Sequence, residues 1–414
     1  MAKCVCGRQF SSNDALIQHQ DAKSQNGNSC SDGSAPSKRL PWSERWLWHN
    51  ARGRDEPISI VQSHALEASS MAVSSTVESE LICTYNWQEC DEARIYVPGC
   101  APRWRNNTLP ITLQEDKGSY FVHQNAARIP KYAFEPVFRA SALLKPGFRF
   151  DNVDIVANRN SLRKLFDFCG GRVNSNFKVN LSIVKNTLFI ERCEMSAREL
   201  IRGSNRSGWG HNFEKAFTSF PSGADDSSGH HRVLCYSIGD LRCVVRFEVD
   251  ACYDMDNAGS NQVDSLLLQI NALSLTESST DRSCPPAMMP QSTAAELKSS
   301  QKPKSVGIYL PQLWFGRTPW LIIGYHTKGT FHSVKVTHTL PLFQNWEKDH
   351  QSELRRMVTL LHALRGAVRR NNGRNCTAVC EKTSNAKVIK IFQSTDRKRA
   401  LPEELISQFW ASTC

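Results

Sequence analysis

The sequence predicts a mixed α/β (α+β) protein, in which a mixed central β-sheet is flanked by helices and preceded by a disordered N-terminal arm. Two pairs of segments rich in β-branched and aromatic residues lie at 181–190 and 233–249. Apolar residues recur at helical spacing between 348 and 370. Because hydrophobic residues make up 40% of the 414-residue chain, a core can form, and a wholly disordered chain is excluded.

Residues 1–30 resemble a C2H2 zinc finger with an incomplete ligand set. Cys4 and Cys6 are separated by one residue, whereas the cysteines of such fingers are two to four residues apart. No second histidine follows His19 at the usual spacing, and Cys30 stands too far away to replace it well. We therefore expect a degenerate finger that does not hold Zn²⁺, because a structural zinc site needs four ligands.

The composition then changes twice along the chain. Residues 31–80 are rich in Ser, Asn, Asp and Gly, and they predict a flexible linker with little core. A globular domain is expected over 81–410. Within it, 253–293 is a Ser- and Pro-rich stretch that predicts a loose insertion between two strands, with a short helix at 266–275.

Within the globular domain, apolar runs and turn residues predict the elements in order. Two hairpins come first, each with a short polar turn. A helix, two further strands and a long amphipathic helix with a basic outer face follow. These segments are 181–184 with 187–190, 233–237 with 241–249, then 308–315, 320–325, 331–336 and 348–370.

The formal net charge of +11 is concentrated near the C-terminus. Residues 351–400 hold 12 Lys or Arg against 3 Asp or Glu. This segment is typical either of a surface that tracks the backbone of RNA or of a solvated basic face. Within it, Arg397-Lys398-Arg399 could contribute to nuclear import, or it could be a solvated turn.

No apolar run approaches the 18 residues that a membrane helix needs, so we expect no membrane partner. The N-terminus has no apolar segment of a secretory signal, and the 15 cysteines are scattered. This pattern favours reduced thiols and an intracellular protein, nuclear or cytoplasmic, with the nucleus slightly favoured.

Two short charged patterns place candidate metal-binding and catalytic side chains on the predicted sheet. Glu248 and Asp250 end an apolar strand, while Glu296 and Lys298 lie in a second strand. Because residues i and i+2 of a strand point to the same face, each pair shares a face. Three carboxylates beside a lysine suit Mg²⁺ or Mn²⁺, which prefer oxygen ligands and bridge to phosphate oxygens. Either pair alone is also the pattern of a solvated strand face.

Together, the two patterns resemble the active site of PD-(D/E)xK nucleases. Further segments at 154–164, 208–214 and 309–325 extend the resemblance. In this order and spacing, roughly residues 100–340 are similar to the eukaryotic DXO family of decapping exoribonucleases, which also act as RNA 5′-pyrophosphohydrolases. The resemblance implies a PD-(D/E)xK nuclease-like fold.

The resemblance also implies a role for each matching residue. The metal ligands would be Glu214, Glu248, Asp250 and Glu296. The catalytic residues would be Glu248, Asp250, Glu296 and Lys298, and the lysine would position the attacking water. Substrate phosphate would be held by Arg159 and Gln312.

The implied activity is Mg²⁺- or Mn²⁺-dependent hydrolysis at the 5′ end of RNA. It would remove a pyrophosphate or an incomplete cap, and 5′→3′ exonuclease activity is a further reaction of the family. The implied partners are RNA 5′ ends and a 5′→3′ exoribonuclease.

Two departures from the DXO pattern leave a second function open. The gap between Asp250 and Glu296 is long, and Asn160 stands where the family usually has glycine. The alternative is a catalytically inactive RNA- or partner-binding protein on the same fold. Such a protein would bind RNA without needing a metal.

Some segments do not match the DXO pattern but are similar to fungal proteins labelled geranylgeranyl pyrophosphate synthetase. They are Tyr85–Asp116, Asn125–Arg128 and Glu135–Ala140. Prenyl synthases bind diphosphate through two Asp-rich motifs, and Asp225-Asp226 lacks the third aspartate of such a motif. A prenyl diphosphate synthase is therefore a remote third alternative. His230-His231 follows in the same Ser/Gly-rich stretch, and we expect it to face the solvent or to lie in a hairpin turn.

Overall fold

The computed structural model describes residues 2–4, 8–25, 42–53, 55–202, 208–254, 271–274, 288–382 and 387–411. It divides the chain into two compact units, 1–46 and 47–414. Helix α2 (Trp42–Trp48) contains the boundary between them. All of the predicted site residues belong to the second unit.

The first unit contains a short hairpin and a helix. Strands β1 (Ala2–Lys3) and β2 (Gln9–Phe10) pair antiparallel, and α1 (Asn13–Gln25) follows. His19 stands on this helix, with its ring 4.9 Å from that of Phe10. Cys6 and Cys30, two of the candidate zinc ligands, lie outside the described residues.

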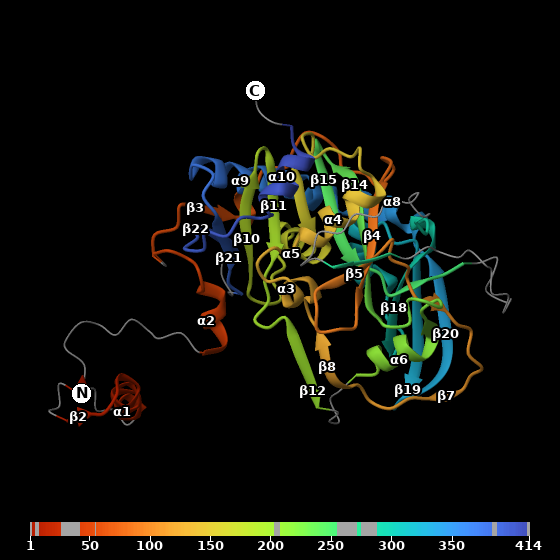
Figure 1. The fold of residues 1–414 in the computed structure, drawn as a ribbon, viewed down its shortest axis with the longest axis horizontal. Coiled ribbons are helices and arrows are strands. Elements are labelled where there is room, and N and C mark those ends of the chain that lie inside the picture. The colour runs from red at the N-terminus through yellow and green to blue at the C-terminus, as the bar shows by residue number, and fades with distance from the viewer. Residues whose placement is uncertain are drawn as a thin grey trace. The chain divides into compact units, whose positions relative to one another are not determined.

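In the described part of the second unit, the larger sheet has eleven strands and is mixed (Figure 1). Strands β15, β9 and β11 run parallel at its centre, and antiparallel strands extend it on both sides. In order across the sheet the strands are β17 (Asn271–Ser274), β5 (Arg94–Val97), β4 (Glu80–Gln88), β14 (Ser227–Ile238), β15 (Leu241–Glu248), β9 (Ile155–Asn158), β11 (Thr187–Arg192), β10 (Phe177–Val184), β21 (Cys376–Cys380), β22 (Val388–Gln393) and β3 (Ser59–Gln62).

Helices cover both faces of this sheet. On β9, Ile155 and Ala157 point into one apolar cluster, while Val156 between them points into another. Because both faces are buried, the central strands are continuous apolar runs without alternation. The first face is covered by α5 (Arg159–Cys169), α7 (Leu310–Gly316), α8 (Leu340–Asp349) and α9 (Gln351–Arg370), and the second by α4 (Glu135–Leu144) and α10 (Glu403–Phe409).

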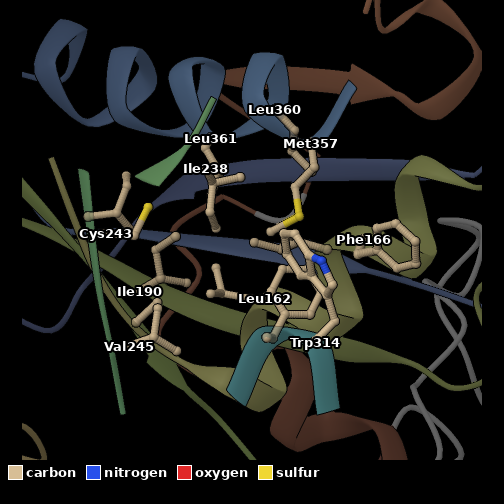
Figure 2. Packing of buried hydrophobic residues seen from close by; sticks show 14 of the residues in the cluster. Leu162, Phe166, Ile190, Ile238, Cys243, Val245, Trp314, Met357, Leu360 and Leu361 are labelled. Atoms are coloured by element: carbon tan, nitrogen blue, oxygen red, sulfur yellow. The ribbon is translucent and has the colours of Figure 1, made fainter. Parts of the chain in front are cut away.

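Figure 2 shows the layer that α5, α7 and α9 form on the first face. Met357 and Leu361 of α9 point toward the sheet, and Trp314 of α7 and Leu162 of α5 meet them there. These four side chains are fully buried. This layer is what anchors the first turn of α5 and the helix α7, both of which carry predicted site residues.

A second, smaller sheet follows where the chain leaves β15. In the described residues its order is β13 (Thr218–Ser219), β6 (Arg103–Trp104), β16 (Ala251–Cys252), β18 (Ala294–Ser300), β19 (Trp320–Thr327), β20 (Thr330–His338) and β7 (Ile111–Thr112). Helix α6 (Gly210–Phe217) packs on it through Phe213 and Phe217. The remaining elements are the ribbon β8 (Lys117–Phe121) with β12 (Arg198–Arg202), and helix α3 (Gln124–Arg128).

The structure confirms the predicted mixed α/β fold and both predicted hairpins. It differs at two places. The second unit already begins at Leu47, and β3 joins the large sheet, although we expected the globular part to begin at residue 81. Residues 271–274 of the predicted short helix form strand β17 instead, because β5 offers a free edge. The remainder of that predicted helix lies outside the described residues. No helix in the described ranges is long and apolar enough to span a bilayer.

Candidate active site

The predicted acidic residues meet where the chain passes from the large sheet to the second sheet. Strand β15 ends at Glu248, Asp250 follows, and β16 begins at the next residue. Strand β16 then pairs antiparallel with β18, which carries Glu296. The main-chain N–H of Leu297 donates to the Asp250 carboxylate at 2.9 Å and holds Asp250 against β18. The junction of the sheets thus brings together the two patterns found in the sequence.

Glu248 and Asp250 hold their protons more tightly than free carboxyl groups do. Burial, followed by repulsion from Asp250, raises the pKa of Glu248 from 4.5 to about 7. Burial, followed by repulsion from Glu296, raises the pKa of Asp250 to about 6. The Glu248 side chain is exposed to solvent, but it lies inside a pocket. The protein atoms that line the pocket therefore cause the effect of burial on its pKa. Crowded carboxyl groups of this kind are stabilised by a nearby cation.

Glu296 is the carboxylate of the site with the most partners. It is 3% exposed and accepts hydrogen bonds from Lys298 at 2.5 Å, from Arg159 at 3.2 Å and from Gln312. Burial opposes its ionisation, but Lys298 and Arg159 outweigh burial and lower its pKa to about 2. Burial likewise opposes the charge of Lys298, yet Glu296 and Asp250 raise the pKa of the lysine. Lys298 is therefore a cation at neutral pH.

Two helices bring Arg159 and Gln312 to these carboxylates. Helix α5 begins at Arg159, directly after β9, and the guanidinium lies 5.3 Å from the ring centre of Phe247 on β15. Gln312 lies in the first turn of α7 and accepts a hydrogen bond from Arg163 at 3.0 Å. Arg163 is one turn after Arg159, so α5 and α7 are linked at the edge of the site.

Glu214 adds a fourth acidic group from α6. The Asp116 carboxylate holds the start of this helix, because it accepts the main-chain N–H groups of His211 at 3.2 Å and Asn212 at 2.9 Å. Burial, followed by repulsion from Asp250, raises the pKa of Glu214 well above 4.5. All seven residues predicted from the sequence are therefore grouped at one junction.

The donor set suits a divalent cation, although its side chains are not yet arranged around one. Glu214, Glu248 and Asp250 are carboxyl groups whose pKa is raised, so a hard cation would stabilise their ionised forms. Among the residues that the structure describes, no three Asp, Glu, His or Cys side chains are placed to hold a metal ion as they stand. The close contact of Lys298 with Glu296 is one reason for this arrangement, because the ammonium group pairs with the carboxylate that would otherwise bind the metal.

These residues open into a pocket of about 280 Å³. Arg159, Glu248, Asp250, Glu296 and Gln312 line it. The sequence analysis did not find a further group of arginine, histidine and amide side chains that line the same pocket. They include His123, Asn125, Asn160, Arg163, Arg192, His231 and Arg246.

The expectation that His230-His231 faces the solvent or lies in a hairpin turn was wrong. Both residues lie inside β14, between β4 and β15, and they are only 1% and 5% exposed. The sequence contained an indication of this arrangement, because the segments around Tyr85 and Asn125 do not match the DXO pattern. Tyr85 donates to Asn125 at 2.6 Å, and Asn125 in turn contacts His231 at 3.0 Å.

Solved structures of Rai1 have the same fold. S. pombe Rai1 superposes with a TM-score of 0.53 at 13% identity, covering 81% of this chain and 99% of that chain. Scheffersomyces stipitis Rai1 in complex with (3′-NADP)⁺ and calcium ion gives 0.54 at 13% identity, covering 86% and 98%. Candida albicans Rai1 in complex with pU5-Mn²⁺ gives 0.51 at 13% identity, covering 83% and 98%. The resemblance to the DXO family is thereby confirmed at the level of the fold.

Comparison with curated proteins finds no match. A family model described as "Domain of unknown function (DUF8563)" matches residues 56–410, which include both sheets and every residue of the candidate site. Because this match spans most of the sequence, the chain belongs to the DUF8563 family.

Proposed function

We propose that this protein is a divalent-cation-dependent hydrolase of RNA 5′ ends, which removes a pyrophosphate or an incomplete cap. The observation that carries the proposal is the convergence of Glu248, Asp250 and Glu296 with Arg159 and Gln312 in one pocket, where Lys298 pairs with Asp250 and Glu296. Support also comes from the Rai1 structures of the same fold, one of which was solved with pU5 and Mn²⁺.

The acidic residues would hold the cation. Mg²⁺ or Mn²⁺ would be bound by Glu214, Glu248, Asp250 and Glu296, and when bound it polarises the phosphoryl group and lowers the pKa of a coordinated water. Glu296 is already ionised at neutral pH because its pKa is about 2. Glu248 and Asp250, with pKa values of about 7 and 6, would release their protons as the cation binds.

Lys298, Arg159 and Gln312 would act on the substrate. Lys298 is protonated, so it would hold the attacking water by donating to it and offset negative charge that builds up on phosphorus. It would not remove a proton. Arg159 stands at the positive end of the α5 dipole, and its guanidinium would hold substrate phosphate together with the Gln312 amide.

The test is hydrolysis of 5′-triphosphate and cap-labelled RNA with Mn²⁺, with Mg²⁺ and with EDTA. The native protein should release 5′ products only with metal, and Glu248→Ala/Asp250→Ala should release none. A matched control is Asp240→Ala/His362→Ala, which removes an exposed side-chain hydrogen bond outside the pocket. Product release that persists in EDTA or in the acidic double variant would contradict the proposal.

The second candidate is an RNA-binding protein without turnover. It is favoured by the arrangement of the acidic side chains, of which no three in the described ranges are placed for a metal. This candidate predicts equal RNA affinity in Mn²⁺ and EDTA, and no 5′ product with either. An exoribonuclease partner and a nuclear location stay predictions from the sequence.

A further inference from the structure

The pocket that holds Glu296 is also lined by side chains that the proposed reaction does not use. We define this polar wall by His123, Asn125, Asn160, Arg163, His231 and Arg246, all of which line the pocket. It lies directly beside the acidic residues, because His231 on β14 is the cross-strand neighbour of Glu248 on β15. The pocket that contains Glu248 is therefore also lined by His231.

The protonation state of His231 is set by a chain of hydrogen bonds. The indole N–H of Trp87 and the hydroxyl of Tyr85 donate to Oδ1 of Asn125, at 3.2 and 2.6 Å. Because an indole N–H can only donate, Oδ1 is the carbonyl oxygen of the amide. The amide nitrogen then donates to Nε2 of His231 at 3.0 Å, so the proton of the imidazole is on Nδ1. The Tyr85 ring stacks on His231 at 4.9 Å and fixes its plane.

That Nδ1–H group has no partner. Nδ1 of His231, Nε2 of His123 and Oδ1 of Asn160 are all buried atoms without a hydrogen bond in the described structure. Both histidines are 5% exposed, and burial lowers the pKa of each well below 6.5, so they are neutral. Buried polar atoms without partners are destabilising and uncommon. The two histidine nitrogens at one pocket indicate a ligand that supplies the missing partners, whereas Oδ1 of Asn160 is an acceptor and needs a donor.

Two guanidinium groups on the same wall lack a counter-charge. Arg159 and Arg192 are paired with Glu296 at 3.2 Å and Glu194 at 2.7 Å. In contrast, neither Arg163 nor Arg246 has a carboxylate within 4.0 Å in the part of the chain that is described. Arg163 donates to the Gln312 amide and Arg246 to the carbonyl of Ala133, both of which are neutral.

This combination of groups selects the chemistry of the ligand. A neutral imidazole N–H and two unpaired guanidiniums all donate hydrogen bonds, and the guanidiniums also require negative charge. Phosphate oxygens meet both requirements, because guanidinium binds phosphate with two parallel hydrogen bonds. A ligand carboxylate fits less well than a phosphate. If its oxygens accept from the guanidiniums, none is left to bind a metal that Glu248 and Asp250 hold.

We propose that the polar wall is a second phosphate subsite, which holds a phosphate next to the one that the acidic residues and Arg159 would hold. This inference rests on the proposed function and deepens it, since it implies a substrate with at least two neighbouring phosphates. The second phosphate belongs either to the 5′ phosphate chain or to the next phosphodiester of the RNA. Asn125 is a positioning residue, because it acts only through the proton on His231.

Equilibrium binding tests the subsite without relying on turnover. The ligands are an RNA with a 5′-triphosphate, the same RNA with a 5′-monophosphate, and the single nucleotide UMP, each measured with Ca²⁺ and with EDTA while a gel checks that the RNA stays intact. The variant Arg163→Gln should weaken binding of the triphosphate RNA about tenfold, as expected for one charge-assisted contact. The control Arg149→Gln removes an arginine outside the pocket that donates to the main-chain carbonyl of Gln408, and it should change nothing.

The pattern across ligands identifies the source of the phosphate. A loss confined to the triphosphate RNA assigns the subsite to the 5′ phosphate chain. An equal loss for both RNAs, with UMP unaffected, assigns it to the next phosphodiester. Binding of all ligands within twofold of the native protein overturns the proposal, and so does an equal loss for UMP, because Arg163 would then hold the first phosphate only.

A second variant tests the role of Asn125. In Asn125→Asp the carboxylate still accepts from Tyr85 and Trp87, but it also accepts from His231, which moves the imidazole proton to Nε2. Nitrogen NMR of His231 should show the exchanged tautomer, and the affinity for the RNA affected by Arg163→Gln should fall about tenfold. An exchanged tautomer with native affinity would show that Nδ1–H does not contact the ligand.

The outcomes separate this inference from the proposed function. Weaker binding in these variants, without any RNA hydrolysis by the native protein, would support the subsite and contradict the proposed hydrolase activity. RNA hydrolysis by the native protein, with native binding in Arg163→Gln and Asn125→Asp, would support the hydrolase activity and contradict the subsite.

Discussion

Glu248 and Glu296 occupy the same pocket, yet their surroundings shift their pKa values in opposite directions. Lys298 and Arg159 contact Glu296 and lower its pKa to about 2, whereas Glu248 has no ion pair in the described residues and its pKa rises to about 7. The position of the cations therefore decides which carboxylate is ionised before a metal arrives. This asymmetry leads to a prediction about stability.

Glu248→Gln should remove a pH dependence from the stability of the metal-free protein. A carboxyl group whose pKa is higher in the folded state binds its proton more tightly there, so its contribution falls as the pH rises from about 4.5 to about 7. Because the side chain is partly solvated, the effect is about 1 kcal/mol rather than the full value of the shift. Chemical unfolding in EDTA at pH 5 and pH 8 should show the variant more stable than the native protein only at pH 8. Equal stability at both values would contradict the pKa assignment.

Gly229 permits the close approach of two side chains to β14. A Cβ atom at this position would lie 2.7 Å from Oε1 of Gln124 and 2.9 Å from Oε1 of Glu248. Because both atoms are at the ends of flexible side chains, Gly229→Ala should change the unfolding free energy by less than about 1 kcal/mol. The displaced carboxylate should lower kcat/KM for RNA about 100-fold. A surface control, Gly147→Ala, has open space at the Cβ position and should keep native activity.

At the scale of elements, Asp116 lies in a loop and holds the start of α6, the helix that carries Glu214. It is 3% exposed and accepts the first main-chain N–H groups of α6, so it acts as the cap of that helix. Asp116→Ala should lower the unfolding free energy by about 1 kcal/mol. It should also weaken Mn²⁺ binding in calorimetry, because Glu214 loses its fixed position. Native Mn²⁺ affinity in a folded variant would show that α6 does not supply a ligand.

Local sequence patterns predicted those elements whose stabilising contacts are local. The hairpin of β10 and β11 was predicted because a polar turn at Lys185 separates two apolar runs, and α9 because its apolar residues repeat at helical spacing. The start of β14 was not predicted, since its Ser- and Gly-rich residues are typical of a loop. They form a strand because β4 and β15 pair with both of its edges, and those partners are distant in sequence.

At the scale of the whole molecule, the site depends on contacts between distant segments. Glu296 and Lys298 could be found because a two-residue spacing and a family resemblance both point to them. The polar wall could not, because Asn125 and His231 are 106 residues apart and no short motif contains both. Its residues become a group only when the large sheet places β4, β14 and β15 side by side.

The basic segment at 351–400 yields a prediction for the binding of long RNA. Arg369 and Arg370 end α9 on an exposed surface. If this face tracks the RNA backbone, each neutralised charge should reduce the slope of log affinity against log salt by about 0.7. Arg369→Gln/Arg370→Gln should therefore make this slope shallower by about 1.4 for a long RNA, measured between 50 and 200 mM salt. The slope for a dinucleotide should stay unchanged. An unchanged slope for long RNA would mean that the excess charge is a solvated face, and that RNA contacts the protein only at the pocket.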